Sequence, residues 1–148
     1  MKISTKGRYG LRILLDLALH DEEKPRMIHQ IAESQQISEK YISRLIIDLR
    51  RAGMVKSVRG AKGGYRIARK PESITLLEIV EVMEGPLLVV ECLASGHECG
   101  RSSQCPTREV WMALSKDIRQ CMAKIKLSDL IQKARIKDSS SGYFDYCI

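Results

Sequence analysis

Residues 37–68 read ISEKYISRLIIDLRRAGMVKSVRGAKGGYRIA, and this stretch decides the fold that the sequence predicts. Its first half has apolar residues at helical spacing, namely Ile42, Leu45, Ile46 and Leu49. Ser38 is a favourable N-cap for such a helix, and Gly53 is placed to end it. The spacing therefore predicts a helix that begins after Ser38, ends near Gly53 and buries one face.

Two short β-strands are predicted directly after this helix, at residues 54–58 and 65–68. The residues that join them, 59–64, are rich in glycine and contain two cations, Arg59 and Lys62, but no acid. Glycine lets a backbone approach a phosphate closely, and arginine suits the narrow, electronegative minor groove of DNA. A phosphate-binding enzyme loop is the alternative, but this segment leads into a strand and lacks the P-loop spacing. The pattern therefore predicts the wing of a winged helix.

A short helix is predicted at residues 27–33, just before the helix that begins after Ser38. Two short helices joined by a tight turn are the layout of a helix-turn-helix, whose second helix enters the major groove. Lys40, Ser43 and Arg44 lie off the apolar stripe near the start of that second helix. They are candidates to reach base edges or phosphates, and the alternative is a merely solvated helix surface. The adjacent cationic wing favours DNA binding.

Charge is concentrated in the first half of the chain. Residues 1–70 contain sixteen lysines and arginines against seven acids, whereas residues 71–148 contain nine against eleven. A basic front half favours a polyanion partner for that half alone. No apolar run approaches the roughly 18 residues that span a bilayer, and no cleavage pattern follows the basic N-terminus. We therefore expect a cytoplasmic protein with no membrane partner.

A long amphipathic helix of about twenty residues is predicted from Pro106, with Cys105 as its N-cap. Its apolar residues form one broad stripe, at Val110, Leu114, Ile118, Cys121 and Ile125, with Trp111 and Met122 beside it. Packing back on its own domain would use part of this face. A twofold dimer through this helix would bury it more fully, so we expect a homodimer. Cys121 is predicted to be a core residue of this face.

The remaining segments complete the prediction. Helices are expected at residues 5–20, from an N-cap at Ser73 or Thr75 to an end at Gly85-Pro86, and at 127–134. A flexible link at 137–142 would then lead to an aromatic tail, 143–148, that docks on its own or a neighbouring subunit. The fold class is mainly α with a small β-hairpin. Its parts are a winged helix-turn-helix DNA-binding domain (1–85), a cysteine-bearing loop (86–106), and a dimerisation helix with tail (107–148).

Three of the five cysteines, Cys92, Cys99 and Cys105, lie within the glycine- and serine-rich stretch CLASGHECGRSSQC. An odd number of cysteines in a reducing compartment favours metal or redox use over a disulfide framework. Small residues let a loop bend so that thiolates converge on one ion or cluster. The positive end of the helix that begins at Pro106 favours the thiolate form of Cys105. We therefore predict a metal or iron–sulfur site in this loop.

The motifs together resemble a known family over nearly the whole chain. They are MKISTKGRYGLR, ISEKYISRLIIDLRRAGMV, SVRGAKGGYRIA, SITLLEIVEVMEG, the three loop cysteines and CPTREVW. These resemble the IscR/NsrR/RirA/CymR family of dimeric winged-helix regulators. The resemblance implies binding to inverted-repeat operator DNA, with recognition helices in the major groove and wings in the minor groove. It also implies a repressor that governs iron–sulfur cluster biogenesis or related iron, sulfur and redox genes.

The same resemblance suggests roles for single residues. Cys92, Cys99 and Cys105 match cluster ligands, for a 2Fe–2S cluster in preference to 4Fe–4S. Arg59 matches the wing arginine, and Ser43 sits where cluster-dependent specificity is set in some members.

Two positions depart from the family pattern and leave the fourth ligand unassigned. The IscR branch has a histidine three residues after the last loop cysteine, where this chain has Arg108. The NsrR branch takes an acidic ligand from the partner's first helix, where this chain has Arg8. Candidate fourth ligands are Glu109, His97, a histidine of the other subunit or a small exogenous ligand.

Two further functions are weighed against the iron–sulfur regulator. The start, the wing and the aromatic C-terminus also resemble the CymR branch, which lacks the loop cysteines. The alternative is thus a cysteine-metabolism repressor, or a thiol- or zinc-dependent one, of the same fold. Zinc sites usually have short C-x-x-C knuckles, which are absent here. An enzyme is not expected, because no acid/base pair or oxyanion arrangement can be identified.

Overall fold

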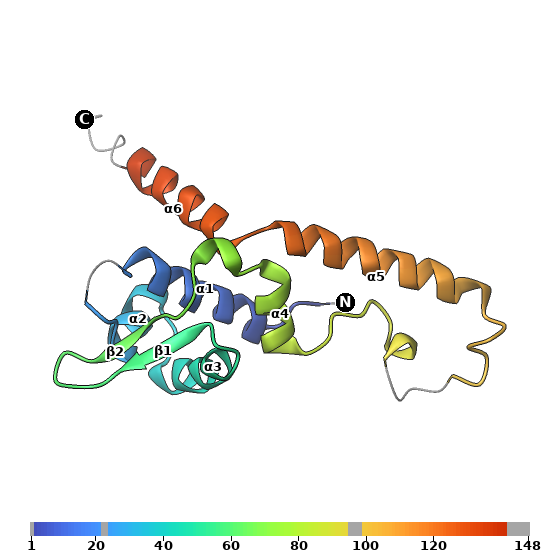
Figure 1. Cartoon of the computed structure of the whole chain (residues 1–148), viewed down its shortest axis with the longest axis horizontal. Helices are drawn as coiled ribbons and strands as arrows, with labels where there is room; N and C mark the ends of the chain where they lie inside the picture. Colours follow the sequence, from blue (N-terminus) through green and yellow to red (C-terminus); the bar gives the residue numbers. More distant parts are fainter. Residues whose placement is uncertain (1, 22–23, 95–98, 142–148) are drawn as a thin grey trace.

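In a computed structural model of the chain, described over residues 2–21, 24–94 and 99–141, the fold is mainly helical with one β-hairpin (Figure 1). The tail at 143–148 and His97 lie outside these residues. The elements, in chain order, are α1 (Thr5–Leu19), α2 (Ile28–Gln35), α3 (Glu39–Arg51), β1 (Val55–Val58), β2 (Gly64–Ile67), η1 (Pro71–Ser73), α4 (Leu76–Glu84), η2 (Glu91–Leu93), α5 (Pro106–Lys124) and α6 (Leu127–Ser141).

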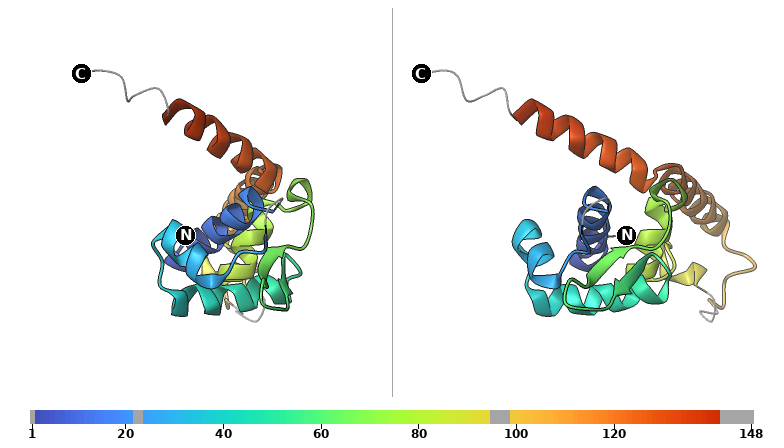
Figure 2. Two further views of the ribbon diagram at one scale, coloured as in Figure 1. Left: turned by 90° about the vertical axis from the view of Figure 1, so that its left-hand side faces the viewer. Right: turned by 60° about the vertical axis from the view of Figure 1, so that its left-hand side comes forward.

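The predicted winged helix is confirmed. The four apolar residues of the α3 stripe are all buried, at Ile42, Leu45, Ile46 and Leu49. They pack with buried residues of α1, α2 and α4 in one core. Because α3 and the hairpin both pack on this core, they lie together on the side of the molecule opposite α6 (Figure 2).

The helix ends follow the local chemistry of the sequence. The Ser38 side chain accepts the Tyr41 N–H at the start of α3. Gly53, which follows the C-cap residue Ala52, takes φ +69°, a left-handed conformation that suits glycine. Of the two candidate caps for α4, Thr75 is the one used, since its hydroxyl oxygen accepts the Glu78 N–H at 3.2 Å.

Strand β2 of the wing is hydrogen-bonded to β1 and also to the segment before α2. Strands β1 and β2 pair antiparallel with Val55 opposite Ile67, and Tyr65 of β2 also pairs with Arg26 through two backbone hydrogen bonds of 2.8 and 3.0 Å. Gly64 has φ +152°, and a Cβ there would lie 2.5 Å from the Arg26 carbonyl oxygen. Position 64 therefore requires glycine because the segment before α2 packs closely against it. This reason is independent of any approach to a DNA phosphate.

A buried polar cluster joins α1, α2 and the wing. Asp16 is only 2% exposed, although it lies within the apolar run of α1. Its carboxylate accepts hydrogen bonds from Arg26 (3.1 and 3.2 Å), Ser34 (2.6 Å) and Gln35 (3.1 Å). A buried carboxylate is tolerated when it is paired and hydrogen-bonded in this way. The cluster fixes α2, the first helix of the helix-turn-helix, against α1.

Helix α4 holds the N-terminus of α1. The Glu84 carboxylate accepts hydrogen bonds from the Ser4 N–H (3.1 Å), the Ser4 hydroxyl (2.7 Å) and the Gly7 N–H (2.8 Å). Burial alone would raise the pKa of Glu84, but the hydrogen bonds from Ser4 and Gly7 outweigh it and the pKa is lowered. The carboxylate thus satisfies donors at the start of α1 that the helix itself leaves free.

The α5–α6 junction is attached to the winged helix. The Leu76 N–H donates to the Ile125 carbonyl at 2.8 Å, and the Leu127 N–H donates to the Ile74 carbonyl at 2.9 Å. Leu127 is fully buried in the main core. Helix α6 continues to Ser141, so the predicted helix end at 134 is wrong. The flexible link predicted at 137–142 is also wrong over residues 137–141, which are helical. The division of the chain at 85 and 106 stays a prediction.

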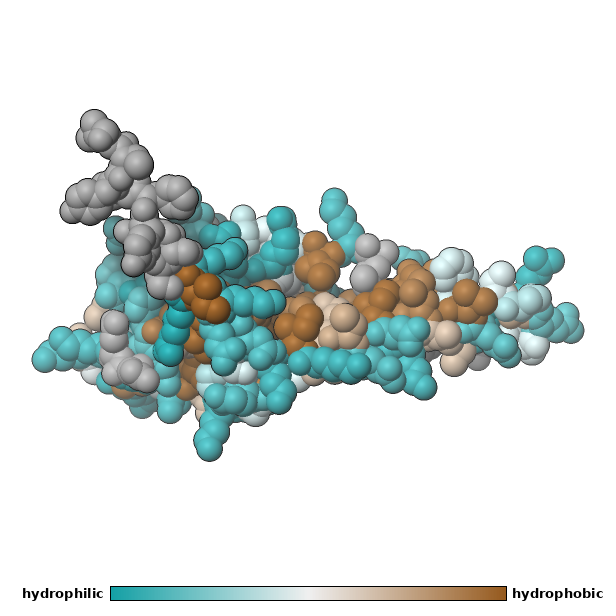
Figure 3. Space-filling model, turned by 90° about the horizontal axis from the view of Figure 1, so that it is seen from above, coloured by the Kyte–Doolittle hydropathy of each residue, from teal (hydrophilic) through white to brown (hydrophobic). Residues whose placement is uncertain are grey.

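Helix α5 extends away from the winged helix and is only partly covered by its own chain (Figure 1). Ser115 and Met122 are buried against the domain. Val110 and Met112 are 60% and 53% exposed, and apolar atoms extend along α5 on the face seen in Figure 3. Cys121 is exposed as well, because its side of α5 turns away from its own domain. The prediction that Cys121 is a core residue is therefore wrong for the single chain. In the described ranges, no helix is long and apolar enough to cross a membrane.

Candidate nucleic-acid interface and cysteine loop

Helix α3 presents the predicted DNA-contact residues at its N-terminal half. Lys40 and Arg44 are exposed, and no ion pair of theirs is found in the described part of the chain. The Ser43 hydroxyl donates to the Glu39 carbonyl oxygen at 2.8 Å, which leaves its oxygen able to accept one further hydrogen bond. The structure therefore places all three on one helix in the arrangement that the sequence predicted, while their contacts to DNA stay predictions.

Two residues of α1 position the start of α3 and were not identified from the sequence. The Tyr9 ring packs edge-on against the Tyr41 ring, with centroids 5.9 Å apart. The Arg12 guanidinium lies 5.3 Å from the Tyr9 ring centre and donates to the Gln35 side chain at 3.1 Å. Arg12 also donates to the Gln35 carbonyl. These contacts connect α1 to the turn of the helix-turn-helix and to the first turn of α3.

The wing presents Arg59 and Lys62 to solvent. Both side chains are exposed, and neither forms an ion pair within the described residues. Gly60, between them, has φ +112° with nothing near its missing Cβ, which is consistent with a tight hairpin tip. The tip therefore carries two exposed cations, while their contacts to DNA stay predictions.

The three loop cysteines lie near the start of α5 but are not gathered. Cys92 is half-buried in η2, Cys99 is exposed, and Cys105 is half-buried at the N-cap of α5. Among the described residues, no group of three histidine, cysteine or acidic side chains is close enough to hold a metal ion. Glu109 is exposed in the first turn of α5, and His97 lies outside the described residues.

The start of α5 lowers the pKa of the Cys105 thiol. Its sulfur lies 3.2 Å from the Thr107 hydroxyl, and this hydrogen bond, aided by the charge of Arg108, lowers the pKa of the Cys105 thiol. The predicted N-cap position is confirmed, but the side chain that contacts the sulfur is Thr107, which the sequence did not single out. A thiol with a lowered pKa forms the thiolate, the species that binds metals and reacts with oxidants.

Arg108 connects the two ends of the cysteine loop. Its guanidinium donates to the Cys92 carbonyl oxygen at 3.1 Å, from the third residue of the helix that Cys105 caps. Arginine cannot ligate a metal, so Arg108 supplies positive charge near the thiols instead of a fourth donor. Three thiols, one of them with a lowered pKa, are donors that suit an iron–sulfur cluster or zinc. The donor chemistry therefore fits such a group with one position left open.

The compact helical core, the recognition helix and the cationic wing define a winged-helix transcription regulator that binds DNA. The sequence profile of the Rrf2 family, described as iron-dependent transcriptional regulators, matches residues 3–133, and the chain belongs to this family. Protein rrf2 of Nitratidesulfovibrio vulgaris is 40% identical over 136 residues, which cover 92% of this chain and 91% of that protein. The family description and the names of further relatives, such as the HTH-type transcriptional regulator CymR of Bacillus subtilis, make the chain a transcription regulator and not an enzyme, as the sequence predicted.

Two solved structures of this family are similar in both fold and sequence. CymR, the global cysteine regulator of B. subtilis, superposes with a TM-score of 0.74 at 38% identity, over 90% of this chain and 98% of that chain. T. potens IscR superposes with a TM-score of 0.73 at 40% identity, over 90% and 88% respectively. The two resemblances noted in the sequence, to IscR and to CymR, are thus both confirmed.

Proposed function

We propose that this chain is a homodimeric repressor that binds inverted-repeat operator DNA and is controlled by an iron–sulfur cluster at Cys92, Cys99 and Cys105. It acts in the cytoplasm on genes of iron–sulfur cluster biogenesis or of related iron, sulfur and redox metabolism. A 2Fe–2S cluster is favoured over a 4Fe–4S cluster. The observation that carries the regulatory part is the contact of Arg108 with Cys92, which joins both ends of the loop at the start of α5.

The DNA-binding step follows from the charges on α3 and the wing. Lys40, Ser43 and Arg44 enter the major groove from the N-terminal half of α3, where side chains reach base edges. Arg59 enters the adjacent minor groove, because guanidinium groups are attracted to its negative potential. Lys62 contacts phosphates and contributes affinity without sequence preference.

The dimer is supported by the uncovered face of α5. Val110 is 60% exposed and Leu114 is 41% exposed, and both lie in the predicted stripe. A second copy of the chain buries this stripe against its own, and the twofold axis then presents two α3 helices to two half-sites of one operator.

The loop residues transmit the regulatory signal to this dimer face. When bound, an iron–sulfur cluster supplies a centre that responds to iron supply and to oxidants. Cys92, Cys99 and Cys105 hold it as thiolates, and Arg108 offsets part of their negative charge. Because Cys105 caps α5, loading the loop orders the first turn of the dimer helix and favours one spacing of the two winged helices. A coupling of about 1–3 kcal/mol would change operator affinity about 5–150-fold.

A second function is favoured by the exposure of Cys99 and the lowered pKa of Cys105. These are properties of a thiol that reacts directly with oxidants or binds zinc. The similarity to CymR also favours a cysteine-metabolism repressor. In that case the same loop would act without a cluster.

Anaerobic reconstitution separates the two functions. The wild type is expected to contain iron and sulfide, to absorb visible light, and to change operator affinity when the cluster is removed. Cys99→Ala is expected to lose all three properties. Ser103→Ala, which changes an exposed residue of the same loop without removing a thiol, is the matched control and should keep them. Zinc without sulfide in the wild type, or equal behaviour of the two variants, would support the second function.

A further inference from the structure

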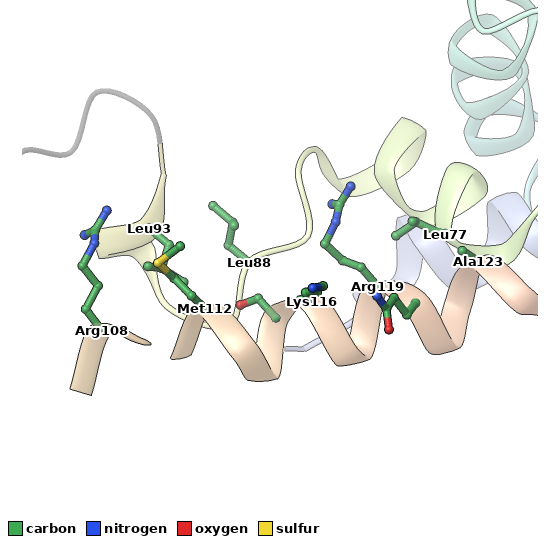
Figure 4. Close-up of a pocket in the computed structure, with 10 residues that line it drawn as sticks. Leu77, Leu88, Leu93, Arg108, Met112, Lys116, Arg119 and Ala123 are labelled. Carbon is green, nitrogen blue, oxygen red and sulfur yellow. The ribbon is translucent and has the colours of Figure 1, made fainter. Parts of the chain in front are cut away.

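A surface cavity of about 470 Å³, wide open to solvent on one side, lies beside the cysteine loop, between α5, α4 and residues 87–93. Its apolar wall includes Leu77, Leu88 and Met112, and Figure 4 shows α5 side chains projecting toward the side where Leu88 lies. The Val89 N–H donates to the Ser115 hydroxyl at 3.3 Å, which ties the 87–93 segment to α5. The volume falls within the roughly 300–1,000 Å³ that is typical of small-molecule sites.

The charged side chains that line this cavity are cationic, and Ser115 and Gln120 are its neutral polar residues. Arg108, Lys116 and Arg119 line it, and among the residues that the structure describes no acidic side chain does. Arg119 is neutralised by an ion pair with Glu81. Lys116 is exposed and has no ion pair within the described residues, while Arg108 donates one hydrogen bond to the Cys92 carbonyl. Arg108 and Lys116 are thus available to an anion in the cavity. They lie about one helical turn before and after Met112 on α5.

The cavity lies on a different side of α5 from the proposed dimer face. At about 100° per residue, Arg108, Met112 and Lys116 fall within about 80° of one another around the helix. Val110 and Leu114 are centred about half a turn away on the same helix. A second copy that packs on the exposed stripe therefore leaves the cavity free.

We infer that this cavity binds a small organic anion with an apolar body, such as a medium-chain or aryl carboxylate. The carboxylate contacts Arg108, while Lys116, about 12 Å further along α5, adds positive potential, and the apolar body covers Met112 and the leucines. Because Arg108 also contacts Cys92, the bound anion acts on the same residue that joins the ends of the cysteine loop. The site goes beyond the proposed function, since it would exist whether or not the loop holds a cluster.

The test uses octanoate as the probe and two glutamate substitutions on opposite sides of α5. Octanoate is expected to bind the full-length wild type at one site per chain in calorimetry, and octanamide, which has no charge, at least about tenfold more weakly. Met112→Glu is expected to weaken octanoate binding at least about tenfold, because a carboxylate beside the bound anion repels it. The same variant should stay dimeric in sedimentation.

Val110→Glu is the matched variant, since Val110 is a similarly exposed apolar residue of α5 outside the cavity. It is expected to lose the dimer and to keep octanoate affinity. The inference is overturned if the wild type does not saturate with octanoate at millimolar concentration, if Met112→Glu binds it unchanged, or if Met112→Glu loses the dimer. Operator binding and iron content, measured on the same samples, report on the proposed function separately.

Discussion

The winged helix and the α5 region differ in how completely their side chains are buried or hydrogen-bonded within a single chain. In the winged helix, even a carboxylate within the core, Asp16, has hydrogen bonds from three side chains. In the α5 region, Val110 and Met112 are more than half exposed, and the loop thiols are not gathered. The winged helix is thus packed and hydrogen-bonded within one chain, whereas the α5 region leaves apolar side chains and thiols exposed, as the proposed dimer, cluster and ligand would require.

This difference suggests that the winged helix reads DNA and that the α5 region serves the proposed regulation. A rigid core holds α3 and the wing in the geometry that DNA requires, because binding groups on packed elements lose little freedom on binding. The proposed regulation needs an element whose arrangement changes at low cost, and we expect the cysteine loop and α5 to be that element. The following predictions test each side of this comparison.

The largest effect is expected from the buried cluster of the winged helix. Asp16→Ala leaves Arg26, which is largely buried, without its partner carboxylate. We expect a loss of about 3–5 kcal/mol in the free energy of unfolding, measured by urea denaturation. Asp129→Ala removes an acid that caps the start of α6 at the exposed Lys126 N–H, and should cost about 1 kcal/mol or less. Equal losses in the two variants would mean that the winged helix is not the more completely packed region.

An intermediate effect is expected at the wing. Arg59→Ala should weaken the specific operator complex by about 1–3 kcal/mol and change sequence preference near the minor-groove contact. Lys62→Ala should weaken binding to all sequences and reduce the salt slope by about 1, because it removes one phosphate contact. Fluorescence anisotropy at several salt concentrations, on operator and random DNA, measures both. Identical, sequence-independent losses would contradict the two separate roles.

The smallest effect is expected at the start of α5. The Thr107 hydroxyl lowers the pKa of Cys105, so its thiolate forms at a lower pH than that of an ordinary thiol. The interaction with the thiolate therefore contributes to stability above the thiol's ordinary pKa and is lost as pH falls through the lowered pKa. Thr107→Val should raise the pH midpoint of Cys105 alkylation by iodoacetamide, and Thr107→Ser should keep it. A midpoint that is the same in all three proteins would show that Cys105 is not activated by its neighbour.

Local patterns predicted the winged helix well because each signal is carried by neighbouring residues. The apolar stripe of α3, the Ser38 cap and the glycine-rich wing all depend on spacings of a few residues. The same is true of the N-cap position of Cys105. The contacts of Asp16 and Glu84 were missed, because their partners come from distant parts of the chain. For Asp16, an acid within an apolar helical run was the one available signal.

The sequence by itself determined the helix-turn-helix, the wing and the presence of three thiols near the start of a long helix, since these depend on residue type and spacing. Only the tertiary structure decided which side of α5 faces its own domain, that Arg108 contacts Cys92, and that a cationic cavity lies beside them. The physical reason is that these features arise where segments far apart in the chain pack together. Packing of that kind is set by the whole core and by no local pattern.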